Sequence, residues 1–355
     1  STFKEIRGTL IKSVSSDPAN PQIGQIWYNS TIGFLKGYRT VASAFSSGGN
    51  RNDGQADGCG AGTLTAGLAF GGGRNPNSPS SGGLATQTQS EEYNGSSWAE
   101  GGAMSTGRTT FGGFGTQTAA LAFGGRTTNN PFTYTNATEE YGGSSWTSGG
   151  NLGAAQYGMN RSGGGIQTAA VSVGGFLISP ARNETEEYNG SSWTSVNNMI
   201  TNTARGVYLG TQTSGILING QPPSSVNAAY NYDGTNWTAN PASTNLALLT
   251  RSGIGDASAG LLMGGSPYAA NTSSELWNGT AFSNDAVAAV VRNGAQSSCA
   301  SPVSAGYNTS GTNASTPGSA LVILLTMPRA KFGITRLLVL LNRFLQQVHG
   351  QVVEI

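Results

Sequence analysis

The chain has 355 residues, only 10% of them charged, and a formal net charge of +1 at neutral pH. This balance provides neither a basic stripe for phosphates nor an acidic tail for cations, so nucleic acid is not expected as a partner. The 54 glycines favour turns and strands over helices.

Two segments precede the first repeat. Residues 1–25 lack the apolar core of a secretory signal peptide, which predicts synthesis in the cytoplasm, and we expect them to form a leader that attaches to a partner. Residues 26–50, IWYNSTIGFLKGYRTVASAFSSGGN, end like SSWTSGGN at 144–151 within the repeats. They are therefore expected to form the outer hairpin of a repeat unit whose inner strands come from elsewhere in the chain.

Five repeat units then follow, spaced by 44 to 48 residues between their first aromatic residues. A period of this length is typical of repeat architectures. Each unit opens with an alternating apolar segment that ends in glycine: GLAFGG at 67–72, ALAFGG at 120–125, AVSVGG at 170–175, GILING at 215–220 and GLLMGG at 260–265. Alternation followed by glycine predicts a strand that runs into a turn.

The second half of each unit predicts a β-hairpin, as in TEEYNGSSWTS at 185–195. A glycine after the first aromatic residue allows the positive φ of a tight turn, and a second aromatic residue follows five positions after the first. The turns are expected near 94–96, 142–144, 189–191, 233–235 and 278–280. The aromatic residues are expected to pack between units: Tyr93, Trp98, Tyr141, Trp146, Tyr188, Trp193, Tyr232, Trp237, Trp277 and Phe282.

A glycine-rich stretch such as GAAQYGMNRSGGG at 153–165 can supply a fourth strand to each unit. A single four-stranded sheet cannot bury both faces, so neighbouring sheets must stack, and closure into a ring hides the end faces. The predicted fold is an all-β propeller of four-stranded antiparallel blades over residues 26–318. Six blades are favoured and seven are the alternative, with residues 26–30 pairing near the C-terminal blade and inner strands at 290–307 completing a composite blade.

The C-terminal segment, residues 319–355, differs in composition from the repeats: it is rich in leucine, poor in glycine, and contains the chain's one histidine, His349. Four cations interrupt its apolar runs before they reach the length that a bilayer requires: Arg329, Lys331, Arg336 and Arg343. No membrane insertion is therefore expected. Two explanations stay open, namely an amphipathic docking segment and a repeat whose coding sequence is read in a shifted frame.

The di-glycine after an apolar strand, followed by Tyr and then Trp, resembles the kelch repeat over about residues 40–310. Kelch-like propellers include copper oxidases, whose site needs histidine ligands. Because His349 lies outside the repeats, no metal or cofactor is expected. The stretch NYDGTNW at 231–237 resembles the Asp box of sialidases only superficially, because its adjacent Asp and Gly fit a hairpin turn.

Three acidic pairs recur in the repeats: Glu91 with Glu92, Glu139 with Glu140, and Glu186 with Glu187. Adjacent residues of a strand point to opposite faces, so the two carboxylates of a pair do not share a site. Solvated hairpin acids are expected in preference to catalytic acids or calcium ligands. The sequence therefore predicts a protein that is not an enzyme.

The segment DPANPQIGQIWYNSTIGFLKGY at 17–38 resembles the leader of tailed-phage virion proteins. The TEEYNGSSW arrays resemble those of phages that infect marine cyanobacteria. These resemblances imply a virion structural protein, a tail fibre or decoration protein present in many copies on the particle and involved in host attachment. Other virion proteins or a host-surface glycan would be its partners. A glycan-degrading enzyme on a propeller scaffold and a cytoplasmic kelch scaffold for protein–protein interactions are the alternatives.

Loops are expected to carry the binding residues, because the strands are used in the core. The longest irregular loops cover residues 73–89 and 126–137. Their candidate partner-binding residues are Arg74, Asn75, Asn77, Arg126, Asn129, Asn130, Phe132 and Tyr134.

Overall fold

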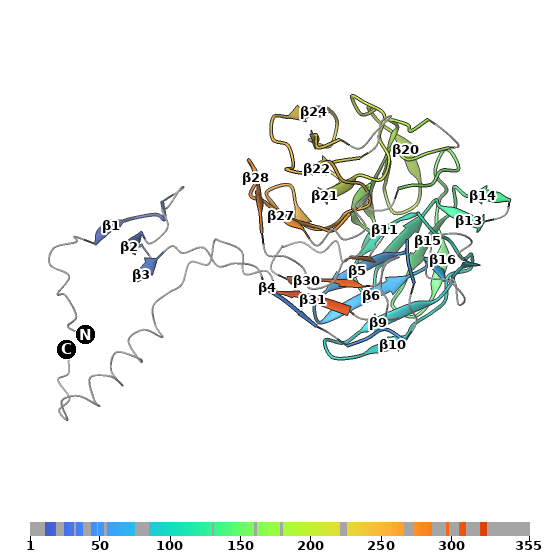
Figure 1. The fold of residues 1–355 in the computed structure, drawn as a ribbon, viewed down its shortest axis with the longest axis horizontal. Coiled ribbons are helices and arrows are strands. Elements are labelled where there is room, and N and C mark those ends of the chain that lie inside the picture. The colour runs from blue at the N-terminus through green and yellow to red at the C-terminus, as the bar shows by residue number, and fades with distance from the viewer. Residues whose placement is uncertain are drawn as a thin grey trace. The chain divides into compact units, whose positions relative to one another are not determined.

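The computed structural model describes residues 11–18, 25–31, 33–37, 44–47, 49–52, 55–74, 85–129, 131–159, 162–177, 180–220, 226–265, 273–285, 296–297, 305–309 and 320–324. Every regular element in this part of the chain is a β-strand (Figure 1). None of these residues forms a helix long and apolar enough to cross a membrane. The chain divides into two units, one of residues 43–325 and one of Ser1–Ala42 with Thr326–Ile355.

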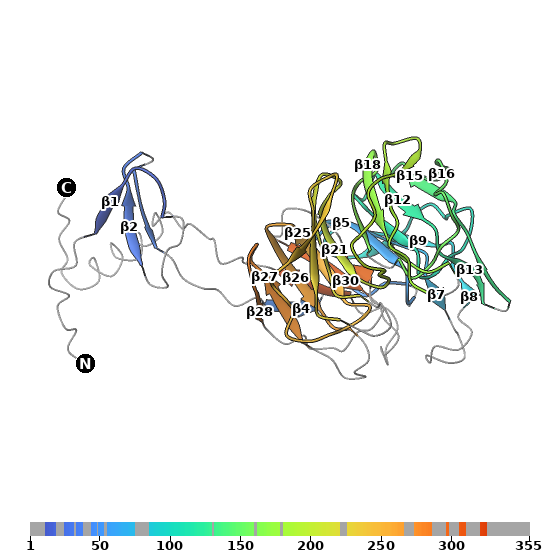
Figure 2. The same cartoon turned by 90° about the horizontal axis from the view of Figure 1, so that it is seen from above.

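The larger unit is a β-propeller with five repeat blades, each a four-stranded antiparallel sheet (Figures 1 and 2). The first blade contains β5 (Cys59–Thr63), β6 (Ala66–Phe70), β9 (Ser90–Tyr93) and β10 (Trp98–Glu100). The second contains β11 (Gly112–Gly115), β12 (Ala120–Phe123), β15 (Thr138–Tyr141) and β16 (Trp146–Ser148). The third contains β17 (Gly163–Ile166), β18 (Ala169–Val173), β19 (Thr185–Tyr188) and β20 (Trp193–Ser195). The fourth contains β21 (Val207–Thr211), β22 (Ser214–Ile218), β23 (Ala229–Tyr232) and β24 (Trp237–Asn240). The fifth contains β25 (Ser252–Asp256), β26 (Ala259–Met263), β27 (Ser274–Trp277) and β28 (Phe282–Asn284).

The outer two strands of each blade form the predicted hairpin. The two repeat aromatic residues stand opposite each other in all five blades, with ring centroids 4.6 to 5.0 Å apart. In the first turn Gly95 has a φ of 95°, which a side chain would strain. Asn94 fixes this turn, because its Oδ1 accepts hydrogen bonds from the backbone N–H groups of Ser96 and Ser97 at 3.0 and 2.9 Å. The hairpin prediction is confirmed.

Glycine-rich strands line the inside of the propeller, where each blade presents its first strand to its neighbours. Strand β11 lies beside both β5 and β17. A Cβ atom at Gly113 would lie 2.8 Å from Cε2 of Phe70 and 2.9 Å from Cβ of Cys59, both in the first blade. The inner strands therefore approach this closely because they lack side chains at such positions.

Hydrogen bonds from repeat side chains join neighbouring blades. The Tyr141 hydroxyl donates to Oε1 of Glu92 in the preceding blade at 2.6 Å, and Tyr188 and Tyr232 bond Glu140 and Glu187 in the same way at 2.5 and 2.8 Å. Indole N–H groups also donate hydrogen bonds to the preceding blade. The indole N–H of Trp146 in the second blade donates to Ser90 Oγ in the first blade at 3.0 Å. The three boundaries from the first blade to the fourth thus combine buried rings with paired polar tips.

A composite four-stranded antiparallel sheet contains strands from both ends of the chain. It contains β29 (Gln296–Ser297), β30 (Ala305–Thr309), β31 (Ala320–Leu324) and β4 (Ala44–Ser47). Strand β29 lies beside the inner strands β5 and β25 of the first and last blades. Its outer pair joins β31 to β4 instead of being a repeat hairpin. Five blades of the repeat type are found, rather than the six expected or the seven left open.

The smaller unit contains a three-stranded sheet of β1 (Lys12–Val14), β2 (Ile26–Asn29) and β3 (Phe34–Gly37). The predicted pairing of residues 26–30 with the C-terminal blade is wrong, because β2 pairs in parallel with β1 and antiparallel with β3. The buried Trp27 explains the difference, since its indole N–H donates to Oδ1 of Asp17 in the leader at 2.9 Å.

The boundaries of the units also differ from the predicted ones at 25/26 and 318/319. Residues 26–42 belong with the leader, and β31, inside the predicted tail, belongs to the composite sheet. The remainder of that tail, residue 319 and residues 325–355, lies outside the described residues.

The inner glycines generate a prediction about packing. Replacing Gly113 by Ala should lower the free energy of unfolding by about 1–3 kcal/mol, because the new methyl group overlaps Phe70 and Cys59. Gly142→Ala is the control, since a Cβ atom there would have the Ser145 carbonyl oxygen as its nearest neighbour, at 3.9 Å. Urea unfolding of both variants measures the difference. Equal stabilities would contradict this account of the inner strands.

The tyrosines at the blade boundaries predict a loss of stability in alkali. Burial, and next a hydrogen bond to glutamate, raises the pKa of Tyr141 and of Tyr188 to about 12. Because the unfolded pKa is about 10, the folded protein holds these protons more tightly, and this contribution is present below pH 10 and lost as the pH approaches 12. Urea midpoints measured from pH 8 to 12 should fall across that window. The double variant Tyr141→Phe with Tyr188→Phe should show a shallower fall, and an identical slope would refute the assignment.

Candidate functional site

The first glutamate of each repeated acidic pair is buried, so the expectation of solvated acids is wrong. Glu91, Glu139 and Glu186 are 2, 2 and 7% exposed. The second glutamates are half-buried and accept the tyrosine hydrogen bonds between blades. The two carboxylates of each pair do face different partners, as strand geometry predicts.

Three buried glutamates pair with a buried arginine that lies just before the inner strand of the same blade. Arg51 pairs with Glu91, Arg108 with Glu139, and Arg251 with Glu275. The Arg108 guanidinium is well satisfied, because it also donates to the carbonyl oxygens of Gly124 and Ala137 at 3.2 and 2.8 Å. Burial lowers the pKa of Arg108, and the Glu139 carboxylate opposes that shift. In the first, second and fifth blades, the pairs therefore hold the entering segment against the third strand.

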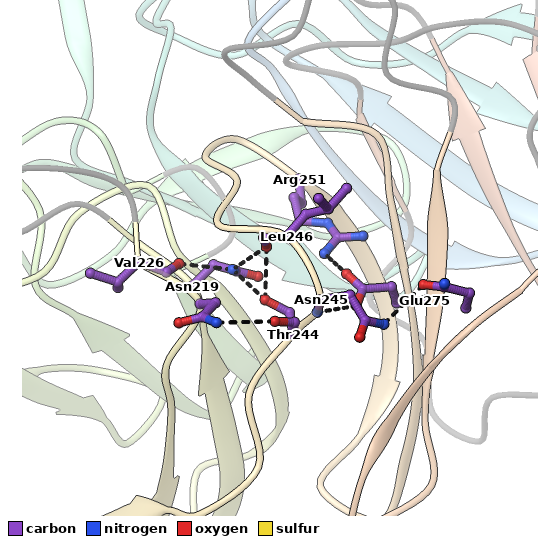
Figure 3. Close-up of polar contacts among 9 residues, drawn as sticks. Asn219, Val226, Thr244, Asn245, Leu246, Arg251 and Glu275 are labelled. Carbon is purple, nitrogen blue, oxygen red and sulfur yellow. Dashed lines mark hydrogen bonds and ion pairs between the residues drawn. The ribbon is translucent and has the colours of Figure 1, made fainter.

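Figure 3 shows this arrangement where the fourth blade leads into the fifth. Glu275 accepts a hydrogen bond from the Asn245 backbone N–H at 2.7 Å on one side and from Arg251 on the other. Asn219 lies in the same close-up and donates through Nδ2 to Thr244 Oγ1 at 2.8 Å and to the Val226 carbonyl oxygen at 2.9 Å. Buried polar groups are thus used to connect successive segments of the chain.

The third blade is an exception to the arginine pairing. Glu186 accepts a hydrogen bond from the Gly153 backbone N–H at 2.8 Å, and no ion pair with it is found among the described residues. Burial raises the pKa of Glu186 above its ordinary value. Within the part of the chain that the structure describes, no three His, Cys, Asp or Glu side chains gather to hold a metal ion.

The candidate loop residues fall on two small hairpins outside the blades. Arg74 ends β7 (Gly73–Arg74), which pairs with β8 (Ala85–Thr86), and Asn129 ends β13 (Arg126–Asn129), which pairs with β14 (Phe132–Tyr134). The two hairpins are neighbours, joined by the Thr86 hydroxyl, which donates to the Thr127 carbonyl oxygen at 3.0 Å. The β13–β14 hairpin projects from the edge of the propeller (Figures 1 and 2). Asn75, Asn77 and Asn130 lie outside the described residues.

Arg126, Phe132 and Tyr134 belong to a continuous row of aromatic and arginine side chains, here called the aromatic row. The row also contains three residues that were not predicted: Tyr157, Phe176 and Arg205. The Arg126 Cζ lies 4.2 Å from the ring centroid of Phe132 and 5.2 Å from that of Tyr157. Tyr157 stacks on Tyr134, with centroids 4.5 Å apart and planes at 10°.

The row continues toward the fourth blade. The ring of Phe176 lies 5.4 Å from that of Tyr157 between centroids, and the Arg205 Cζ lies 5.4 Å from the Phe176 centroid. Backbone hydrogen bonds fix the segments that carry the row. The N–H groups of Tyr157 and Phe176 each donate to the carbonyl oxygen of the other, at 2.9 and 2.7 Å, and those of Arg126 and Thr109 do so at 2.9 Å. The row is therefore a rigid surface that combines residues from the second blade, the third blade and their exit segments.

Two features make the aromatic row a candidate binding surface. Phe132 is 55% exposed, although it is a large apolar side chain. Among the described residues, the Arg126 guanidinium has no acidic or other hydrogen-bonding partner, and its Nε is buried without an acceptor. Burial raises the pKa of Tyr157, with Tyr134 adding to the shift and Arg126 opposing it, so the phenol stays neutral beside the cation.

A signal for the missed residues is visible in the sequence. Tyr157 and Phe176 are aromatic residues that do not recur at the corresponding positions of the other units, unlike the hairpin aromatic residues. Phe176 and Arg126 both follow a di-glycine directly, so they take the same place in successive blades.

The chain matches no family model and no curated protein sequence.

The two kinds of buried glutamate predict opposite effects of neutralisation. Glu139→Gln should lower the free energy of unfolding by about 3–5 kcal/mol, because Arg108 would be left buried without its counter-charge. Glu186→Gln keeps an acceptor for the Gly153 N–H and removes a charge that burial disfavours, so it should be neutral or stabilising at pH 7. Parallel denaturant titrations test the pair. Similar losses in both variants would show that the Arg108 pair has no special role.

Proposed function

We propose that the chain is a non-enzymatic component of a phage particle, which decorates the particle or attaches it to the host through loops at the blade edges. The repeats would be kelch-like, and the propeller would serve as a rigid mount. The proposal rests first on the aromatic row, since it gathers the exposed Phe132 ring and the Arg126 cation, whose buried Nε has no hydrogen-bonding partner in the described part of the chain.

The buried acids support the same proposal against a hydrolytic function. Glu91, Glu139 and Glu275 are each neutralised by a buried arginine, and the second glutamates are bonded to tyrosine hydroxyls between blades. A general acid needs a carboxylate that can reach a substrate. These side chains are instead used to hold the blades together.

The leader supports assignment to a particle, because the segment at 17–38 resembles virion leaders and contains β2 and β3, which form a three-stranded sheet with β1. A separate attachment sheet would leave the propeller loops available for a second partner. Many copies on one particle would allow each contact to be weak, because effective concentration multiplies the overall affinity.

Mass spectrometry of purified particles tests this proposal. The protein should co-purify with the particles in many copies and stay with them through a density gradient. A particle preparation from a strain that lacks the gene is the matched control. If the protein is missing from particles and is recovered as a free monomer in the host lysate, the scaffold alternative replaces this one.

A further inference from the structure

We propose that the aromatic row binds a carboxylate-bearing sugar of a host-surface glycan, with Arg126 holding the carboxylate and the neighbouring rings holding the sugar. This inference deepens the adhesive function proposed above and rests on it.

The first step of the argument is the state of Arg126. Each arginine for which the described residues show an ion pair has a glutamate partner: Arg51, Arg108, Arg182 and Arg251. Arg126 instead lies against the rings of Phe132 and Tyr157, and no ion pair with a carboxylate is found for it among the residues that the structure describes. A guanidinium stacked on aromatic faces keeps its N–H groups in the plane, where they match the two oxygens of a carboxylate.

The second step concerns the aromatic surface beside this cation. Phe132 is more than half exposed, and the stacked rings of Tyr134 and Tyr157 form an apolar platform that carries two hydroxyl groups. A pyranose ring has an apolar C–H face and polar edges, so it can lie on such a ring while its hydroxyl groups bond the tyrosines. A free phosphate or a simple anion would leave this aromatic surface unused.

The third step is the order of groups along the row. A cation at Arg126 is followed by the rings of Tyr157 and Phe176 and then by a second cation at Arg205. A continuous surface of this kind suits a chain of sugars, with Arg126 as the residue that holds the carboxylate. Because the rings and the Arg126 guanidinium already pack against one another, little side-chain entropy is lost on binding.

Calorimetric titration of the full chain with hexagalacturonate, isomaltohexaose and a sulfated isomaltohexaose tests the inference. We expect binding of hexagalacturonate that weakens with added salt, and no binding of the neutral hexamer. Binding of the sulfated oligomer alone, equal binding of the neutral one, or no binding of any of the three would overturn the inference.

Three variants locate the site. Arg126→Lys keeps the charge but loses the planar pair of donors, and it should weaken hexagalacturonate binding about tenfold. Phe132→Ala should weaken it by a similar factor of about ten. Ile166→Ala is the control, because Ile166 is 56% exposed but pairs with Ala169 at the start of β18, whereas Phe176 follows the end of β18, and the affinity of this variant should be unchanged. Thermal unfolding of each variant establishes that it is folded. Unchanged affinity in folded Arg126→Lys and Phe132→Ala would overturn the assignment to the row.

A separate readout distinguishes failure of this inference from failure of the proposed function. Particles that carry Arg126→Lys should adsorb to host cells more slowly than particles that carry Ile166→Ala. If the protein is in the particle and both variants adsorb equally, the sugar site is wrong and the particle role stands. If hexagalacturonate binds but the protein is absent from particles, the particle role is wrong.

Discussion

The hydrogen bond from a tyrosine hydroxyl to a glutamate in the preceding blade is the contact on which the rest of the propeller depends. The tyrosine side chain crosses the boundary between two blades to reach this glutamate. Its ring then packs against the tryptophan of its own hairpin, as Tyr141 does against Trp146, and the glutamate side chain points from its strand toward the next blade. The other glutamate of the pair then faces the segment that enters the blade, where it meets a buried arginine in the first and second blades and the Gly153 backbone N–H in the third. The repeated acidic pair therefore organises both faces of the third strand in these three blades.

The boundary between the fourth and fifth blades shows that the two members of this contact change together. Asn231 stands where earlier blades have the second glutamate, and Trp277 stands where they have the tyrosine. The Trp277 indole donates to the Ala257 carbonyl oxygen at 2.9 Å within its own blade. Val207, Leu209 and Ile216 then pack with the tryptophan in an apolar cluster. Loss of the polar contact is thus compensated by apolar burial.

The hairpins and strands could be predicted because their signals are local: Asn94 and Gly95 encode a turn, and the aromatic residues on either side encode its register. The burial of Glu139 could not, since its partner Arg108 is distant in sequence and strand alternation reveals only that adjacent side chains diverge. The aromatic row was only partly predicted, because Tyr157 reaches Arg126 from a different blade. Strand β2 was misplaced for a similar reason, as Asp17 holds Trp27 against the leader.

The pairing of β4 with β31 has a consequence for how the chain is made on the ribosome. Residues 44–47 are synthesised early, but their partner at 320–324 emerges only after all five repeat blades. The composite sheet beside the first blade therefore stays incomplete while the other repeat blades are synthesised. Each newly folded blade covers the exposed face of the blade before it. A nascent chain that stalls before residue 320 would present two uncovered blade faces, which are the natural substrates of a chaperone.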